Sequence, residues 1–234
     1  MIREHVASGS YGKSTTFTTI AVVTKVFPDV KVGEWYSEGI RYCKVNGLMN
    51  GYTNGENKGK FGLNDSIKRG QIAAILYRLA GSPYGDTDPN TDLVSKFPDV
   101  QNKGSYYYKA VIWASENGVV TGYTSGANAG KFGPNDSIKR QDLAVMLGRY
   151  AKYVEGKDTT STYSLDNFRD GNEVSNYAKE NTYIQYIVEN EIITGKEKKD
   201  TNGKTYFMLD PKATAKRSEA AKMLMSFCKN ILGM

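Results

Sequence analysis

Apolar residues recur at helical spacing in several separate segments of the chain. Stripes at every third or fourth position predict helices with one buried face. Three long stripes consist of Ile72, Ile75, Leu76 and Leu79; Leu143, Met146, Leu147 and Tyr150; and Ala220, Met223, Leu224, Phe227 and Ile231. Two further stripes precede the first two, at Trp35, Tyr36, Ile40 and Cys43 and at Tyr107, Ala110, Val111 and Ala114. The pattern therefore predicts pairs of helices.

The helix pairs belong to a long internal repeat. Residues 60–69 and 131–140 are identical at nine of ten positions, and each segment leads directly into a long apolar stripe. The sequence Phe-Pro-Asp-Val at 27–30 returns at 97–100 and, in weaker form, as Phe-Arg-Asp-Gly at 168–171. We expect repeats at 27–96, 97–167 and 168–234, the last one divergent. Because one helix pair cannot bury its own apolar face, the three pairs are expected to pack around a shared core.

Residues 1–26 match nothing later in the chain. Thr, Val, Ile and Phe are frequent at 15–26, which favours an extended strand. This segment is either an edge strand, residues foreign to the fold, or an arm that docks onto another subunit. No apolar segment typical of a secretory signal follows Met1, so we expect the export route to be encoded elsewhere.

Composition excludes several classes of function. The net charge of +6 fits an acidic partner but is mild, and no nucleic-acid-binding motif accompanies it. One histidine and two cysteines, His5, Cys43 and Cys228, leave little material for zinc sites or histidine-based catalysis, and both thiols are expected to be buried and free. No apolar run is long enough to span a membrane. Neither an enzyme nor a cofactor is predicted, whereas seventeen tyrosines suit carbohydrate or protein contact surfaces.

With these landmarks, the chain resembles three tandem S-layer homology (SLH) repeats. The resemblance rests on the Phe-Pro-Asp-Val openings, the aromatic pair at 35–36, the Asn-Gly helix ends, the Gly-Tyr turns and the arginine-led second helices. The family's Ile-Thr-Arg-Ala-Glu motif appears in altered form at 67–71, 138–142 and 215–219. The resemblance implies a mainly α, pseudo-threefold domain of three helix-pair repeats packed on a shared helical core, here with an extended N-terminal arm.

The resemblance also implies a function. Grooves between adjacent SLH repeats bind a secondary cell-wall polysaccharide, in many members through a pyruvylated N-acetylmannosamine, and anchor proteins to the bacterial cell surface or S-layer without catalysis. The expected partner is therefore an anionic cell-wall glycan. The alternative is a structural subunit of a larger surface or virion assembly, docked to other protein subunits through residues 1–26.

The arginines at the start of the second helices are the main candidates for ligand binding. A guanidinium at a helix N-terminus suits a carboxylate, which it can bind through two parallel hydrogen bonds. Alternatively, each arginine pairs with a nearby aspartate and only ties the repeats together. Lysine replaces the family's threonine before each arginine, which removes the reciprocal helix cap and adds a second cation. These residues are Arg69, Arg140 and Arg217, preceded by Lys68, Lys139 and Lys216. Because the third repeat is divergent, we expect the grooves of Arg69 and Arg140 to be the stronger ones.

Other candidates have equally plain structural explanations. Trp35 and Tyr106 can stack on a sugar ring or lie in the core, whereas Tyr42, Trp113 and Tyr186 are expected in the core. Gly51 and Gly122 can provide turns with positive φ or offer backbone N–H groups to a ligand. Asp29 and Asp99 can cap a turn or accept hydrogen bonds from sugar hydroxyls.

Overall fold

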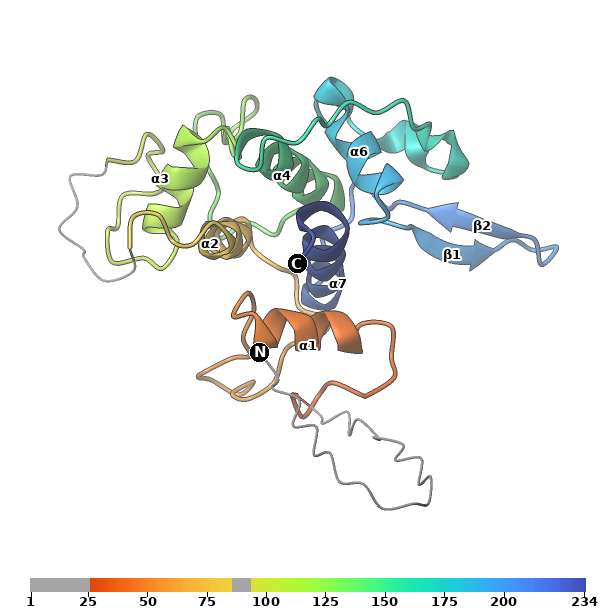
Figure 1. Ribbon diagram of the computed structural model, residues 1–234, viewed down its shortest axis with the longest axis horizontal. Coiled ribbons are helices and arrows are strands. Elements are labelled where there is room, and N and C mark those ends of the chain that lie inside the picture. Colours follow the sequence, from red (N-terminus) through yellow and green to blue (C-terminus); the bar gives the residue numbers. More distant parts are fainter. Residues whose placement is uncertain (1–25, 86–93) are drawn as a thin grey trace, which may run out of the picture.

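The computed structural model describes residues 26–85 and 94–234 and is mainly helical (Figure 1). All but the last residue of the expected N-terminal arm lies outside these described residues. The α-helices are α1 (Ser37–Val45), α2 (Arg69–Leu79), α3 (Tyr108–Glu116), α4 (Arg140–Tyr153), α5 (Asn176–Lys179), α6 (Tyr183–Glu189) and α7 (Arg217–Phe227). The strands are β1 (Lys196–Lys199) and β2 (Thr205–Met208). Short 3-10 turns occupy Leu165–Asn167, Gly171–Glu173 and Glu180–Thr182, and one π turn, Cys228–Leu232, follows α7.

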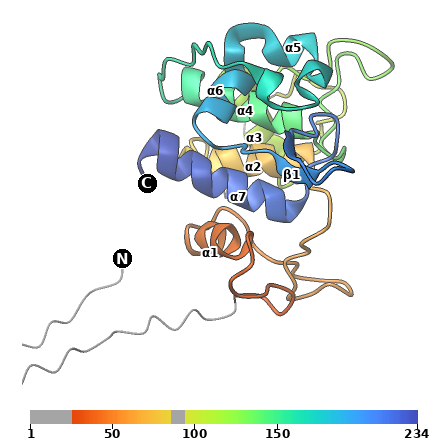
Figure 2. The same cartoon turned by 90° about the vertical axis from the view of Figure 1, so that its right-hand side faces the viewer.

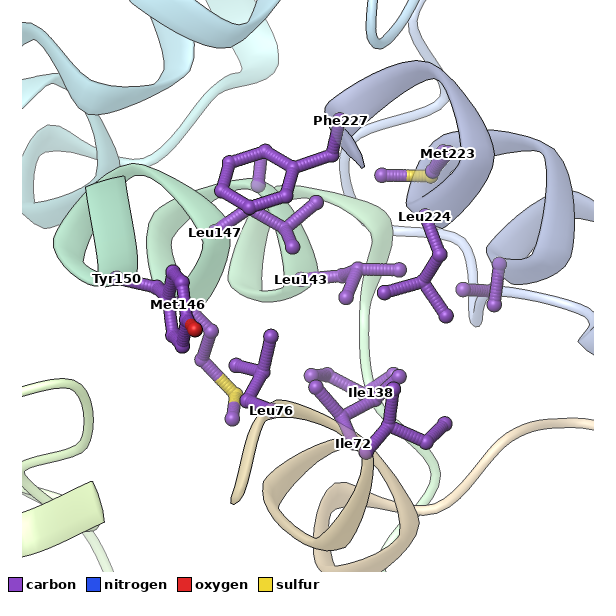
Figure 3. Close-up of a cluster of buried hydrophobic side chains, with 14 of the residues drawn as sticks. Ile72, Leu76, Ile138, Leu143, Met146, Leu147, Tyr150, Met223, Leu224 and Phe227 are labelled. Carbon is purple, nitrogen blue, oxygen red and sulfur yellow. The ribbon is translucent and has the colours of Figure 1, made fainter. Parts of the chain in front are cut away.

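The long helices α2, α4 and α7 share one core. Figure 3 shows their apolar side chains pointing toward one another, among them Leu76, Leu143 and Leu224, none of which is exposed to solvent. A series of aromatic rings continues this core: Trp113 lies 6.2 Å from Tyr150, and Tyr150 lies 5.9 Å from Phe227, between ring centroids. The predicted stripes of these three long helices and the shared helical core are therefore confirmed.

Each first helix packs on the second helix of the preceding repeat. Helix α3 packs on α2, α6 packs on α4, and α1 closes the ring by packing on α7. In Figure 2, α7 accordingly lies between α1 and the remaining helices. Glycines permit these close approaches, since a Cβ on Gly39 would lie 2.8 Å from the Cα of Lys222, and one on Gly148 would lie 2.7 Å from the Cβ of Tyr183.

The duplicated segments meet in a closed triangle of backbone hydrogen bonds. The N–H of Ile67 donates to the carbonyl of Ala215, that of Ala215 to Ile138, and that of Ile138 to Ile67, with N–O distances of 3.0, 2.8 and 3.0 Å. Each repeat thus supplies one donor and one acceptor, at the residue two positions before its second helix.

Several local predictions need correction. In the divergent third repeat, residues 196–199 form β1, which pairs antiparallel with β2 from Lys196 opposite Met208 to Lys199 opposite Thr205. Trp35 precedes α1 and is 54% exposed, so it does not belong to the buried face of that helix. Half of the helix cap also persists: the side chains of Gln71 and Glu219 accept the backbone N–H of Lys68 and Lys216, each at 3.0 Å.

Other expectations hold in the described residues. Cys43 and Cys228 are buried free thiols. Trp113 is buried, whereas Tyr42 and Tyr186 pack against the core and are only partly buried. None of the described helices has the length and apolar character needed to cross a membrane.

Candidate functional site

The three candidate arginines occupy equivalent positions at the first turns of α2, α4 and α7. The guanidinium Nε of each donates to a backbone carbonyl in the next repeat around the ring: Arg69 to Phe132 at 2.8 Å, Arg140 to Leu209 at 2.7 Å and Arg217 to Phe61 at 2.8 Å. All three are buried. Among the described residues none of them forms an ion pair with Asp29, Asp99 or Asp170. The arginines therefore join adjacent repeats, through carbonyl groups and not through those carboxylates.

The equivalent aspartates hold the loops that present these carbonyls. The Asp29 carboxylate accepts the backbone N–H of Phe61 and Gly62, both at 2.8 Å. Asp99 accepts equivalent bonds from residues 132 and 133, and Asp170 accepts them from residues 209 and 210. Partial burial raises the pKa of Asp29, but the N–H donors outweigh this effect and lower it. Each aspartate therefore caps its loop, and the loop in turn positions the carbonyl group to which an arginine donates; Asp29, for example, positions the Phe61 carbonyl that accepts from Arg217.

A cavity of about 390 Å³ opens beside Arg217, between α7, the first repeat and Tyr106. Its lining combines two arginines with polar and apolar groups, and no acidic residue is among the described residues that form it. The lining residues are Leu48, Met49, Asn50, Gly51, Thr53, Gln71, Ala74, Ile75, Arg78, Tyr106 and Arg217. The cavity thus brings Arg78 and Gln71, which were not predicted to bind a ligand, together with Gly51, Tyr106 and Arg217, which were.

Aromatic rings and carbonyl groups fix the Arg217 side chain in this cavity. Its guanidinium carbon lies 5.0 Å from the ring centroid of Tyr52 and 4.8 Å from that of Phe61, and Nη2 donates to the Asn50 carbonyl at 2.7 Å. Burial lowers the pKa of Arg217, against the opposing effect of Tyr52 and Asp65. A buried cation whose charge is only partly compensated favours an incoming anion.

The groove at Arg69 has similar aromatic contacts but a different charge balance. The guanidinium carbon lies 4.7 Å from the ring centroid of Tyr123 and 5.0 Å from that of Phe132. Asp142 takes the place of Gln71 here, and its carboxylate accepts a hydrogen bond from the hydroxyl of Tyr177. Burial, together with this hydrogen bond, raises the pKa of Tyr177 to about 12.

The groove at Arg140 contains a network of ion pairs. Nη1 of Arg140 lies 3.5 Å from Oε1 of Glu219, and the same oxygen lies 2.9 Å from Nζ of Lys196. Lys196 also pairs with Asp210 at 2.9 Å. Lys196 stands where the first two repeats have Tyr52 and Tyr123, so no aromatic ring covers Arg140 at that position.

The remaining candidates are distributed around these grooves. Tyr106 is 62% exposed and lines the cavity, and Trp35 occupies the equivalent position in the first repeat. Both are therefore outside the core. Lys68 donates across the repeat boundary to Ser137 at 3.0 Å, and Lys139 is exposed.

The two candidate glycines differ in their backbone. Gly122 has φ +76°, as predicted for a turn, but the φ of Gly51 is not positive, so that explanation is wrong for Gly51. Its lack of a side chain has a steric reason, because a Cβ would lie 2.6 Å from the Phe27 ring and 2.7 Å from the Lys60 carbonyl oxygen.

Comparisons with known proteins agree with this architecture. Residues 96–144 match the model of the S-layer homology domain. The chain is 27% identical over 198 residues to an endoglucanase of Bacillus sp. (strain KSM-635), covering 85% of this chain and 18% of the relative. It is 26% identical over 140 residues to a cellulosome-anchoring protein of Acetivibrio thermocellus, covering 60% and 27%. It is 30% identical over 132 residues to the surface-layer 125 kDa protein of Lysinibacillus sphaericus, covering 55% and 10%. The chain thus spans less than a third of each of these relatives.

Proposed function

We propose that the chain is a non-catalytic module that anchors a protein to the bacterial cell surface by binding an anionic cell-wall polysaccharide, with a pyruvylated sugar as the recognised unit. In this proposal all three repeats, at 27–96, 97–167 and 168–234, are S-layer homology repeats. The observation that carries the proposal is the cavity at Arg217, which contains two arginines and no described acidic residue.

The geometry of this cavity suits a carboxylated sugar. Arg217 uses Nε and Nη2 for the carbonyl groups of Phe61 and Asn50, and these two bonds orient the guanidinium. Arg78 is oriented in the same way, by a bond of 2.7 Å from its Nη2 to the Leu48 carbonyl. A carboxylate between the two guanidinium groups would gain charge-assisted hydrogen bonds at little entropic cost, because both side chains are already ordered. Tyr106 offers the aromatic face against which a sugar ring would pack.

The relatives support a shared anchoring segment. An endoglucanase and a surface-layer protein are different kinds of protein, yet both resemble this chain over a small part of their length. A segment common to such proteins fits attachment better than catalysis, and a cellulosome-anchoring protein contains it as well. The proposal extends to the other two grooves, with Lys68 and Arg69, and with Lys139, Arg140 and Trp35, as their candidate residues.

The proposed function is tested by isothermal titration calorimetry on the full chain with a pyruvylated secondary cell-wall polysaccharide and the same polysaccharide after chemical removal of pyruvate. Removing one charged partner costs about 1.5–3 kcal/mol, so Arg217→Ala should weaken binding roughly 10- to 100-fold. Arg217→Lys should recover only part of the loss because lysine lacks the planar fork. Arg41→Ala, at an exposed position of α1, is the control for lost charge.

Thermal unfolding of each variant separates lost binding from lost folding. Failure of the wild-type chain to bind the pyruvylated polysaccharide would refute the proposed function. Equal affinity for both polysaccharides would refute the role given to the carboxylate.

A further inference from the structure

Short extended segments precede α2, α4 and α7 and pair with one another around the axis that relates the three repeats. Antiparallel bridges join residue 66 to 216, residue 68 to 137 and residue 139 to 214. The middle residue of each segment, Ile67, Ile138 or Ala215, is fully buried, and Figure 3 shows Ile138 among the buried side chains of the core. Because successive side chains of an extended segment point to opposite faces, the residues that flank these three face away from the core.

The outward face of the three segments is a ring in which lysines alternate with hydroxyl groups. Each bridge places a lysine opposite a serine or threonine. The Nζ of Lys68 donates to the Ser137 hydroxyl at 3.0 Å, and the hydroxyl oxygens of Ser66 and Thr214 lie 3.2 Å apart. Both contacts cross a boundary between repeats, so side chains of all three repeats meet on this face. We call these six residues the axial lysine ring: Ser66, Lys68, Ser137, Lys139, Thr214 and Lys216.

We propose that the axial lysine ring binds a phosphate dianion, either free or as a monoester. Such a phosphate has three terminal oxygens arranged around a three-fold axis, so each oxygen can face one lysine and its neighbouring hydroxyl. Lysine binds phosphate as a point charge, and the hydroxyls add hydrogen-bond donors. The inference goes beyond the proposed function, because none of the six residues lines the Arg217 cavity and the ring takes a different anion.

The three lysines leave their charges available to such an anion. Among the described residues, no carboxylate lies within ion-pair distance of Lys68, Lys139 or Lys216. Lys68 donates to a neutral hydroxyl, and Lys216 donates to the neutral side chain of Asn64 at 3.3 Å. Three like charges gathered at one axis repel one another and produce a local positive potential, which attracts a multivalent anion.

The carboxylates next to the ring in sequence are bound elsewhere. Asp65 accepts a hydrogen bond from the Tyr52 hydroxyl at 2.7 Å, and Asp136 accepts one from the Tyr123 hydroxyl at 2.9 Å. These two tyrosines stack on groove arginines, so both carboxylates belong to the grooves. The third repeat has Ala213 at the equivalent position and supplies no carboxylate there.

Helix capping does not explain the lysines. Lys68, Lys139 and Lys216 are the N-cap residues of α2, α4 and α7, but an ammonium group has no acceptor for the free N–H groups of a helix. Threonine, which the family pattern has at this position, is a favoured N-cap residue. The chain has therefore replaced a capping residue with a cation in all three repeats, including the divergent third one, as a shared ligand would require.

The inference is tested by titrating inorganic phosphate into the full chain, labelled with ¹⁵N and with ¹³C-lysine, in a dilute amine buffer where exposed charges are least screened. The side-chain signals of Lys68, Lys139 and Lys216 are assigned from Lys→Thr variants and followed by NMR. They should shift saturably with one common dissociation constant. Glycerol phosphate, a monoester, should give the same response if the phosphate is carried by a larger molecule, whereas a response to inorganic phosphate alone would assign the ring to free phosphate. Dimethyl phosphate, with one charge and two terminal oxygens, should bind at least threefold more weakly.

Substitutions distinguish one shared ligand from three separate ones. Lys68→Thr should weaken the responses of Lys139 and Lys216 at least threefold, because all three lysines contact the same phosphate. The combined variant Lys68→Thr, Lys139→Thr and Lys216→Thr should fold, since threonine caps helices, and the backbone N–H signal of Ile67 should lose its saturable shift. Lys152→Gln removes the same charge at the other end of α4, about 20 Å from Lys139, and should leave the three responses unchanged.

The inference is overturned if each Lys→Thr change silences only its own signal, because the lysines would then act in separate grooves, where the proposed function also names Lys68 and Lys139. It is equally overturned if Arg217→Ala abolishes the lysine responses, or if dimethyl phosphate binds as tightly as phosphate.

The polysaccharide titration is an independent measurement. A chain that shows the expected phosphate responses but binds no pyruvylated polysaccharide would refute the proposed function and leave the axial lysine ring intact. A chain that binds the polysaccharide but shows no saturable phosphate response overturns the present inference alone.

Discussion

Asp170→Asn should destabilise the chain more than the same change at either equivalent aspartate. Asp170 is 3% exposed, and its two carboxylate oxygens accept the backbone N–H of Leu209 and Asp210 at 2.7 and 2.8 Å. The carbonyl of Leu209 in turn accepts the Nε–H of Arg140. The substitution therefore disturbs both the loop and the Leu209 carbonyl group that holds Arg140.

The size of the effect follows from the hydrogen bonds. Asparagine keeps one acceptor oxygen but turns an amide N–H group toward the other backbone N–H, which loses one charge-assisted bond and leaves a buried donor unpaired. A bond to a charged group contributes about 1.5–3 kcal/mol, so we expect a loss of about 2–4 kcal/mol. At 2–4 °C per kcal/mol for a chain of this size, Tm should fall by about 4–16 °C. Asp29→Asn breaks equivalent bonds at a half-buried position, where water can replace the lost acceptor, and should cost about 1–2 kcal/mol.

Urea unfolding followed by circular dichroism measures these differences, provided that the slope of the unfolding free energy against urea is the same for all variants. Asp99→Asn should behave like Asp29→Asn, since both aspartates are half-buried. If Asp170→Asn is no more destabilising than Asp29→Asn, burial does not set the strength of the cap and the reasoning fails.

Three further predictions concern the core, the cavity wall and an ion pair. Phe227→Ala should lower the unfolding free energy by about 3–5 kcal/mol because the ring is fully buried, whereas Phe207→Ala, at an exposed ring on β2, should change it by less than about 1 kcal/mol in the same urea assay. Gly51→Ala should cost about 1–3 kcal/mol because its Cβ would lie 2.6 Å from the Phe27 ring and 2.7 Å from the Lys60 carbonyl oxygen, and because Gly51 lines the cavity the change should also weaken binding of the pyruvylated polysaccharide; Gly104→Ala, whose Cβ would meet only a side-chain oxygen at 3.3 Å, is the matched control. Burial raises the pKa of Glu219, but the Lys216 N–H, Lys196 and Arg140 outweigh it and hold that pKa below its ordinary value of 4.5. The ionised carboxylate therefore stabilises the fold above about pH 4.5 and stops doing so as the pH falls through the lowered pKa, so the stability lost in Glu219→Gln should shrink on acidification; a loss that stays constant from pH 7 to pH 3 would contradict this assignment.

Periodicity in the chain was sufficient to predict the long helices and their buried stripes. These features depend on residues three or four positions apart and on segments that recur at a fixed offset, so they can be recognised without knowing how the chain folds back. The starts of α2, α4 and α7 at the three arginines followed from the same pattern. The offset of 71 residues would also have paired Arg78 with Arg149, a signal that pointed to the second cavity arginine.

The order of helix packing and the charged groups around each arginine could not be read from that pattern. Helix α1 packs on α7 across almost the whole chain, and Arg217 binds the Phe61 carbonyl 156 positions away. The divergence of the third repeat predicts a weaker groove at Arg217, and that strength stays a prediction; the groove itself is lined by residues of the first repeat, among them the neutral Gln71. Each arginine's surroundings come from the next repeat around the ring, so its charge balance depends on which repeats become neighbours when the ring closes. That is a property of the packed molecule, because the contacts that set it join residues far apart in the chain.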